Sequence, residues 1–128
     1  MKGIVISPKG EICVRDYGLP LYKTVGKTVG GYIEIVHPRR LEWPYCMIVD
    51  EELLLKNQFV LNPVGCWLYQ TDVHGSPICG TIVIMKNGYN ADGEPDIVGL
   101  TCEEISYIGG KLMKQFNLNG DIENVRAD

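Results

Sequence analysis

The chain has 128 residues, of which 45% are hydrophobic and 22% are charged, and its formal net charge is −4. These values are typical of one soluble globular domain, and the acidic balance gives no support for generic nucleic-acid binding, which usually needs a basic surface. Every apolar run is far shorter than the roughly 20 residues that cross a bilayer, and Pro8 and Glu11 interrupt the first run before a signal-peptide core could form. We therefore expect a cytoplasmic protein that does not insert into a membrane.

The first predicted elements form a β-hairpin. The stretches "GIVIS" and "EICVRD" are short strands, joined by a tight turn in which Pro8 fixes φ and Gly10 tolerates a left-handed backbone. The next element is a helix, because Leu21, Val25 and Val29 recur every four residues. A glycine pair follows at 30–31, where a helix often ends in a left-handed residue.

Inside this helix, Gly26-Lys27-Thr28 repeats the last three letters of a phosphate-binding P-loop. A complete P-loop has another glycine five positions before the Gly-Lys pair, so that backbone N–H groups can surround the phosphates. That position is Leu21, and the stretch before it, "DYGLP", is a turn and not a buried strand. We therefore exclude a P-loop and predict that Lys27 and Thr28 lie on the solvent side of a short helix.

The middle of the chain predicts a second hairpin. Tyr32–Val36 alternates and is rich in β-branched residues, Tyr45–Asp50 is a second strand that pairs with it, and residues 37–44 form the loop between them. Residues 51–57 are expected to make a helical turn. Asn62-Pro63 then signals the start of a helix with asparagine as its cap.

The last third predicts a central strand and a closing helix. Residues 77–87 are apolar nearly throughout, which indicates a strand covered on both faces, and residues 87–95 are a turn-rich loop. Thr101 and Glu104 make a capping box for a helix that ends near Asn117. The predicted fold is α+β, a small, mainly antiparallel sheet with one or two packed helices. It is a single domain over residues 1–118, followed by a polar tail over 119–128.

We expect no catalytic residues, no metal ligands and no cofactor. The five cysteines are odd in number, contain no C-x-x-C pair and lie among apolar residues, which favours packing over a disulfide framework or a zinc site. The same apolar surroundings disfavour the thiolate that a nucleophilic pair of Cys46 or Cys66 with a histidine would need. Asp72 and His74 lie in a turn, and nothing in the sequence places a third metal ligand beside them.

The loop after the first strand of the second hairpin is the best candidate for a binding site. It is the one place where two arginines adjoin, and arginine matches phosphate or carboxylate oxygens, while nearby aromatic rings can stack on a base. The alternative is a hairpin tip whose arginines are only solvated. The predicted ligand-binding residues, from this loop and from the aromatic segment near residue 65, are His37, Arg39, Arg40, Trp43, Tyr45, Asn62, Trp67 and Tyr69.

Four motifs in order resemble a family of small proteins catalogued only as a domain of unknown function. They are "VGGYIEIVHP", "YCMIVDEELLLKNQFVLNPVG", "SPICGTIVIM" and "DIVGLTCEEI", which together cover Val29 to Ile105. The stretch between Gly65 and Pro77 departs from the pattern. The resemblance implies no enzymatic activity, and it implies an accessory gene of phages, plasmids and bacteria that carry mobile elements.

Three functions remain open. The first is a non-enzymatic counter-defence protein that sequesters a small anionic, nucleotide-like ligand in a pocket with Arg39 or Arg40, with a homo-oligomer as one way to complete that pocket. The second is a protein–protein inhibitor of a host defence effector such as a CRISPR nuclease, acting through a patch around Trp43, Tyr45 and Trp67. The third is a small hydrolase or nuclease, for which the sequence supplies no acid–base pair.

Overall fold

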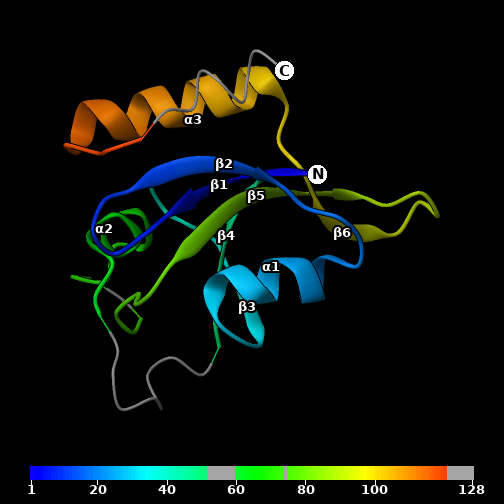
Figure 1. Cartoon of the computed structure of the whole chain (residues 1–128), viewed down its shortest axis with the longest axis horizontal. Helices are drawn as coiled ribbons and strands as arrows, with labels where there is room; N and C mark the ends of the chain where they lie inside the picture. The colour runs from blue at the N-terminus through cyan, green and yellow to red at the C-terminus, as the bar shows by residue number, and fades with distance from the viewer. Residues whose placement is uncertain (52–59, 74, 121–128) are drawn as a thin grey trace.

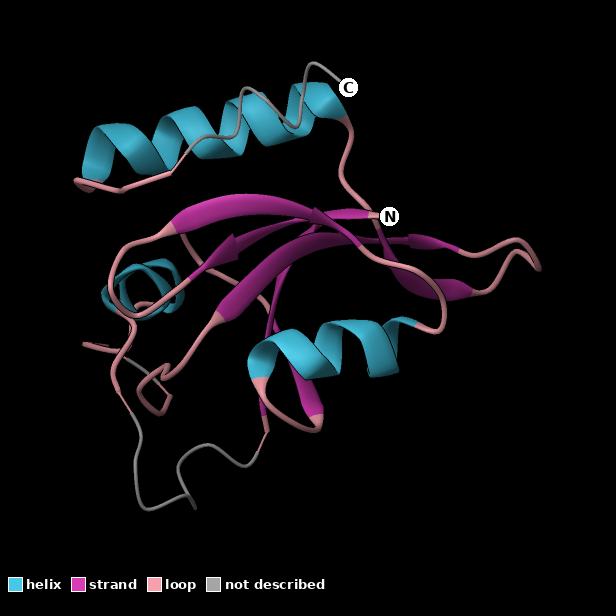
Figure 2. Ribbon diagram, in the orientation of Figure 1, coloured by secondary structure: helices cyan, strands magenta, loops and turns pink. Residues whose placement is uncertain are grey.

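The computed structural model describes residues 1–51, 60–73 and 75–120, and its elements are drawn in Figures 1 and 2. In chain order these are β1 (Lys2–Ile6), β2 (Ile12–Asp16), α1 (Leu21–Val29), β3 (Ile33–Val36), β4 (Tyr45–Asp50), α2 (Pro63–Tyr69), β5 (Ile82–Tyr89), β6 (Pro95–Val98) and α3 (Cys102–Gln115). All strand pairs are antiparallel, so the predicted α+β class is confirmed. The described residues contain three helices where one or two were expected, and most of the helical turn expected at 51–57 lies outside the described residues.

Strand β5 is the centre of the six-stranded sheet, whose order is β2-β1-β5-β4-β3 with β6 paired to β5. The first half of β5 pairs with β1 and the second half with β6, so these two strands follow one another along the same edge of β5. The side chains of residues 82–85 are fully buried. The predicted central strand is therefore confirmed, although it begins at Ile82 and not at Pro77.

Helices cover both faces of the sheet. Figure 2 shows α3 on one side of the strands and α1 on the other. Because successive side chains of a strand point to opposite faces, Ile82 and Ile84 pack in a core with α2 and α3, while Val83 and Met85 pack in a second core with α1. None of the helices that the structure describes has the length and apolar character of a membrane-spanning segment.

The segment 87–95, predicted to be a loop, is instead the end of a β-hairpin. Strand β5 continues to Tyr89, β6 begins at Pro95, and the turn between them spans 90–94. A Cβ on Gly88 would lie 2.6 Å from a methyl of Val98, so glycine allows the two strands to approach here. Pro95 is tolerated because it is the first residue of a strand at the edge of the sheet.

The C-terminal helix starts as predicted. The Thr101 hydroxyl accepts from the Glu104 N–H at 3.2 Å, and Glu104 Oε1 accepts from the Thr101 N–H at 2.9 Å, which confirms the capping box. The same Oε1 is 2.7 Å from Lys86 Nζ on β5. Burial alone would raise the pKa of Glu104, but the hydrogen bonds from Lys86 and Thr101 outweigh burial and lower it.

Beyond α3 the chain returns to the first hairpin. Asn119, which we expected to open a polar tail, forms a bridge with Glu11. Its N–H donates to the Gly10 carbonyl at 2.9 Å and its carbonyl accepts from the Ile12 N–H at 2.7 Å. The rest of the predicted tail, residues 121–128, lies outside the described residues.

Candidate functional site

Arg40, predicted to bind a ligand, makes a packing contact between the 37–44 loop and α2. Its guanidinium lies 4.8 Å from the centre of the Trp67 ring, and its Nε donates to the Trp67 carbonyl at 2.9 Å. The Trp67 ring in turn meets Phe116 edge to face, with ring centroids 5.4 Å apart. Lys111 Nζ donates to the Arg40 carbonyl at 3.0 Å. Arg40 and Trp67 therefore hold α2, α3 and the loop together.

His37 and Trp43, which lie near the two ends of the same loop, form a second pair. Their rings are stacked with centroids 5.6 Å apart, and His37 Nε2 is 3.1 Å from Asn87 Nδ2 on β5. The Trp43 side chain is 72% exposed, and Arg39 is exposed beside this pair in the sequence. Of the eight predicted residues, these three present their side chains most openly to a partner.

The side chains of Asn62 and Tyr45 pack inside the fold, fully or in part. Asn62 is fully buried and caps α2 by accepting from the Gly65 N–H at 3.0 Å, as the sequence predicted. Tyr45 is half-buried at the start of β4, and burial, followed by the negative charge of Glu104, raises its pKa. Asn62 is therefore closed to solvent, and neither residue lines the two pockets described below.

Tyr69 lines a pocket of about 310 Å³ between the ends of β3 and β4 and the segment before β5. Three carboxylates, Glu34, Asp50 and Glu51, share this pocket. Negative charge so concentrated opposes the anionic ligand that we predicted. None of the other seven predicted residues lines this pocket, so the eight predicted residues do not form one site.

A larger pocket of about 700 Å³ lies over α1 and the turn into β3, and we call it the α1 pocket. Three glycines form part of its wall. Its other lining residues are Tyr22, Lys23, Lys27, Tyr32, Ile33 and Glu51. None of the eight residues predicted from the sequence belongs to it.

The glycines explain why the chain can make this wall. The N–H groups of Gly30 and Gly31 both donate to the Gly26 carbonyl, at 2.8 and 2.9 Å, and Gly30 has the left-handed φ of 106° that ends a helix. A Cβ on Gly26 would lie 2.8 Å from the Gly31 carbonyl oxygen. The P-loop-like letters therefore belong to a tightly closed helix end, as predicted.

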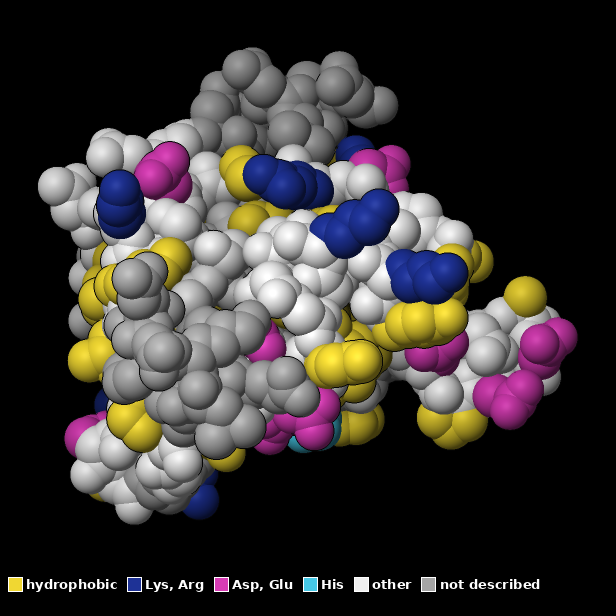
Figure 3. All heavy atoms as spheres, turned by 60° about the horizontal axis from the view of Figure 1, so that its bottom comes forward, with side chains coloured by type: hydrophobic (Ala, Val, Ile, Leu, Met, Phe, Trp, Pro, Cys, Tyr) yellow, Lys and Arg dark blue, Asp and Glu magenta, His cyan; other side chains and the backbone are white. Residues whose placement is uncertain are grey.

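Aromatic and basic side chains are exposed together at the α1 pocket. The side chains of Tyr22 and Tyr32 are 63% and 71% exposed. Lys23 and Lys27 form no ion pair with any residue that the structure describes. Figure 3 shows this face, where basic side chains gather over α1 next to exposed hydrophobic ones. The pocket thus offers flat rings together with two lysine charges that form no ion pair among the described residues.

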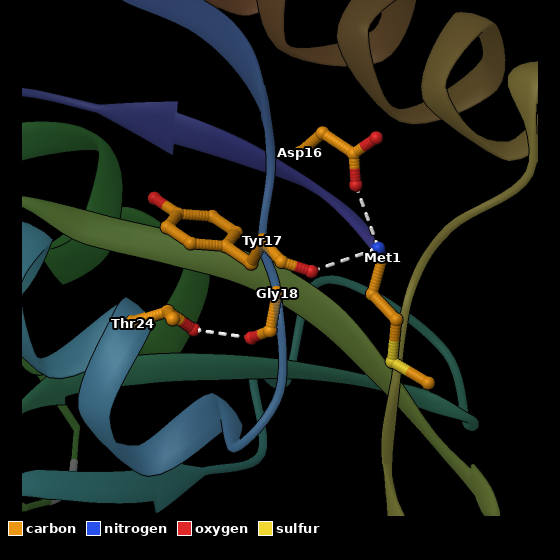
Figure 4. A network of polar contacts seen from close by, with 5 residues as sticks. All are labelled: Met1, Asp16, Tyr17, Gly18 and Thr24. Atoms are coloured by element: carbon orange, nitrogen blue, oxygen red, sulfur yellow. Dashed lines mark hydrogen bonds and ion pairs between the residues drawn. The ribbon is translucent and has the colours of Figure 1, made fainter.

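The loop that leads into α1 is fixed on both sides (Figure 4). The amine of Met1 donates to Asp16 Oδ1 at 2.7 Å and to the Tyr17 carbonyl at 3.0 Å, and this amine lowers the pKa of Asp16. On α1, the Thr24 hydroxyl donates to the Gly18 carbonyl at 2.7 Å. These hydrogen bonds therefore hold α1 in a fixed position relative to β1 and β2.

A further contact changes one expectation about α1. The hydroxyl groups of Tyr17 and Thr28 lie 2.8 Å apart, and Thr28 is half-buried, whereas we expected it on the solvent side. Lys27 is exposed as predicted. Burial raises the pKa of Tyr17, which therefore stays protonated and able to donate to Thr28.

The cysteines are free, and four of the five are buried or half-buried as expected, while Cys102 is exposed. Burial raises the pKa of Cys46 to about 12, which disfavours its thiolate. Cys66 Sγ donates to the Ile78 carbonyl at 3.3 Å. Among the residues described, no three Cys, His, Asp or Glu side chains gather into a potential metal site. His74 lies outside the described residues.

Two residues of the α1 pocket have a spacing that predicts their exposure on one side of α1. On a helix, Lys23 and Lys27 lie on the side opposite the apolar stripe of Leu21, Val25 and Val29, while Tyr22 lies at the edge of that stripe. Two lysines on the solvent side of one short helix are a candidate for binding an anion, because each ammonium group offers three donors to a phosphate. The position of Tyr32 beside them depends on the turn after α1 and could not be read from spacing.

Comparison with known families identifies the chain. The sequence model of a family described as "Domain of unknown function (DUF3846)" matches residues 1–117. The chain therefore belongs to this family. No curated protein and no solved structure matches it.

Proposed function

We propose that this member of the DUF3846 family is a non-enzymatic binding protein that sequesters a small anionic, nucleotide-like ligand in the α1 pocket. One observation carries the proposal: two lysines without ion pairs among the described residues and two exposed tyrosines line the same open pocket of about 700 Å³. This volume lies within the range of roughly 300–1,000 Å³ that small-molecule sites occupy.

The chemistry of the lining residues matches the two parts of a nucleotide. Tyrosine rings stack on bases, and such stacking contributes about 1–3 kcal/mol per base. A lysine ammonium is a compact charge with three donors, which suits a phosphate group. Ile33 adds apolar surface at the start of β3.

The residues that line the pocket favour binding without turnover, because they lack the groups that covalent catalysis needs. Covalent catalysis needs a nucleophile with a base in hydrogen-bond reach. The lining contains neither histidine nor cysteine, no aliphatic hydroxyl, and one carboxylate, Glu51. A protein that only holds its ligand needs none of these groups.

We further propose that the ligand is a signal of a host defence system and that the protein acts in the cytoplasm of the host as a counter-defence accessory of mobile DNA. The support for this setting is the resemblance in the order of sequence motifs. Sequestration agrees with it, because holding a signal molecule denies it to the effector without any chemical step.

Replacing Lys23 and Lys27 together by alanine is expected to weaken the binding of nucleoside monophosphates by about 10- to 100-fold. Each amine contributes roughly 1 kcal/mol to an exposed phosphate, and tenfold in affinity corresponds to about 1.4 kcal/mol. Isothermal titration calorimetry with AMP and GMP measures the change. A parallel thermal scan measures the rise in Tm that binding to the native state must produce.

Lys9→Ala is the matched control, because Lys9 is exposed in the turn between β1 and β2 and is not among the residues that line the α1 pocket. It should bind nucleotides like the unmodified protein. The proposal fails if no nucleotide raises the Tm at millimolar concentration. It also fails if the double variant binds as tightly as the control.

A second candidate function rests on Trp43. This side chain is 72% exposed and stacked on His37, and an exposed tryptophan is a frequent centre of protein–protein binding energy. For an inhibitor of a host defence effector, Trp43→Ala should abolish capture of the effector in a pull-down while leaving the Tm within about 2 °C. Equal capture by Trp43→Ala and by Tyr89→Ala, an equally exposed aromatic on β5, would exclude this patch.

A further inference from the structure

We infer that Glu51 makes the α1 pocket selective for guanine among the nucleotide bases, an inference that rests on the function proposed above. Glu51 is the first residue after β4, is exposed, and lines the pocket together with the two lysines and the two tyrosines. It is the one carboxylate among these lining residues. Glu51 also lines the smaller pocket, beside Glu34 and Asp50, so it lies between the two pockets.

The backbone places Glu51 beside Tyr32. The Glu51 N–H donates to the Tyr32 carbonyl at 2.8 Å, which extends the pairing of β3 with β4 by one residue. Both lysines belong to α1, which forms the other side of the pocket. A nucleotide that stacks on Tyr32 therefore has its base next to Glu51 and its phosphate toward Lys23 and Lys27.

A ligand that displaces water from Glu51 must replace the hydrogen bonds of that water. Among the described residues Glu51 forms no ion pair, although two lysines without ion pairs line the same pocket. Without hydrogen bonds from the ligand, the Glu51 carboxylate would weaken the binding of an anion in two ways. Its negative charge repels the anion, and the carboxylate loses hydrogen bonds to water. A ligand that donates hydrogen bonds to this carboxylate removes the second cost and offsets the first.

Guanine is the base that can donate two hydrogen bonds to one carboxylate. Its ring N1–H and its exocyclic amine lie side by side and point the same way, so that they match the two oxygens of a carboxylate. Adenine and cytosine present an amine next to a ring nitrogen that accepts, and this acceptor faces the second oxygen. Uracil presents one N–H between two carbonyl oxygens. The geometry of a carboxylate edge therefore favours guanine over the other three.

The experiment measures Kd for GMP, IMP and AMP with the unmodified protein and with Glu51→Gln. We expect the Kd for GMP to be lower than the Kd for AMP by about tenfold or more, because one bidentate contact discriminates between two bases by roughly that factor. IMP keeps the ring N–H and lacks the exocyclic amine, so its affinity should lie between the two. With Glu51→Gln, the ratio of the GMP and AMP affinities should fall to one or below, because a glutamine amide has one acceptor oxygen and an N–H donor, a pair that matches the amine and a neighbouring ring nitrogen of adenine.

Glu103→Gln, on the exposed side of α3, is the matched control and should retain the preference for GMP. Equal affinity of the unmodified protein for GMP and AMP overturns the inference. So does a Glu51→Gln variant that binds all three nucleotides more tightly by the same factor, because Glu51 would then act only through its negative charge. Both results leave the proposed function standing. Failure of every nucleotide to bind overturns the inference and the proposed function together.

Discussion

Replacing Asn62 by alanine is expected to lower the free energy of unfolding by about 3 to 4 kcal/mol, through loss of a helix cap and of buried hydrogen bonds. The side chain is fully buried and joins three parts of the fold. Its Oδ1 accepts from the Gly65 N–H of α2, and its Nδ2 donates to the carbonyls of Ile6 on β1 at 3.1 Å and of Gly80 before β5 at 2.8 Å. Alanine leaves all three backbone groups without this partner. Urea unfolding followed by circular dichroism measures the loss.

Asn90→Ala provides the comparison for this effect. The Oδ1 of Asn90 also accepts two backbone hydrogen bonds, from the N–H groups of Asp92 and Glu94, but in an exposed turn where water replaces it. Its loss should cost less than about 1 kcal/mol. If Asn62→Ala cost no more than Asn90→Ala, the buried network would not contribute as we describe.

Gly26→Ala and Gly110→Ala are expected to change stability in opposite directions, although both place alanine in a helix. Alanine is favoured over glycine within a helix by about 1 kcal/mol. At Gly110 on α3 a Cβ meets no neighbour within 4 Å, so this substitution should stabilise the protein by up to that amount. At Gly26 the Cβ lies 2.8 Å from the carbonyl oxygen of Gly31, a backbone atom that can move only if the helix end opens.

We expect Gly26→Ala to destabilise the protein by about 1 to 2 kcal/mol net, the clash exceeding the gain in helix propensity. It should also weaken nucleotide binding, because Gly26 and Gly31 line the α1 pocket. Thermal and urea unfolding of the two variants, together with GMP titration, measure both effects. Stabilisation by both alanines to the same extent would show that the turn after α1 is not closed as tightly as we describe.

The elements that sequence predicted well are those whose signals are local. The capping box of Thr101 and Glu104, the cap at Asn62 and the glycine end of α1 each depend on residues within five positions of one another. Strand β6 was missed for the opposite reason. Its residues include Pro95 and Asp96, which are disfavoured in strands, and it exists because β5 pairs with it across the turn at 90–94.

The candidate site was harder to predict because it depends on contacts between distant residues. The adjacent arginines at 39 and 40 suggested an anion site, but the Arg40 guanidinium packs on Trp67, a contact 27 residues away in the sequence. In the α1 pocket, Tyr22 and Glu51 come from α1 and from the end of β4. Spacing along the chain gives no information on such a juxtaposition, whereas the two solvent-facing lysines of α1 could have been noted.

The most direct test of the α1 pocket is a titration of ¹⁵N-labelled protein with GMP, followed through the backbone amide signals. We expect the largest shifts in amides between Tyr22 and Ile33, including Gly30 and Gly31, and at Glu51. The 37–44 loop should shift little. Shifts confined to that loop, or no shifts at millimolar GMP, would contradict nucleotide binding in the α1 pocket.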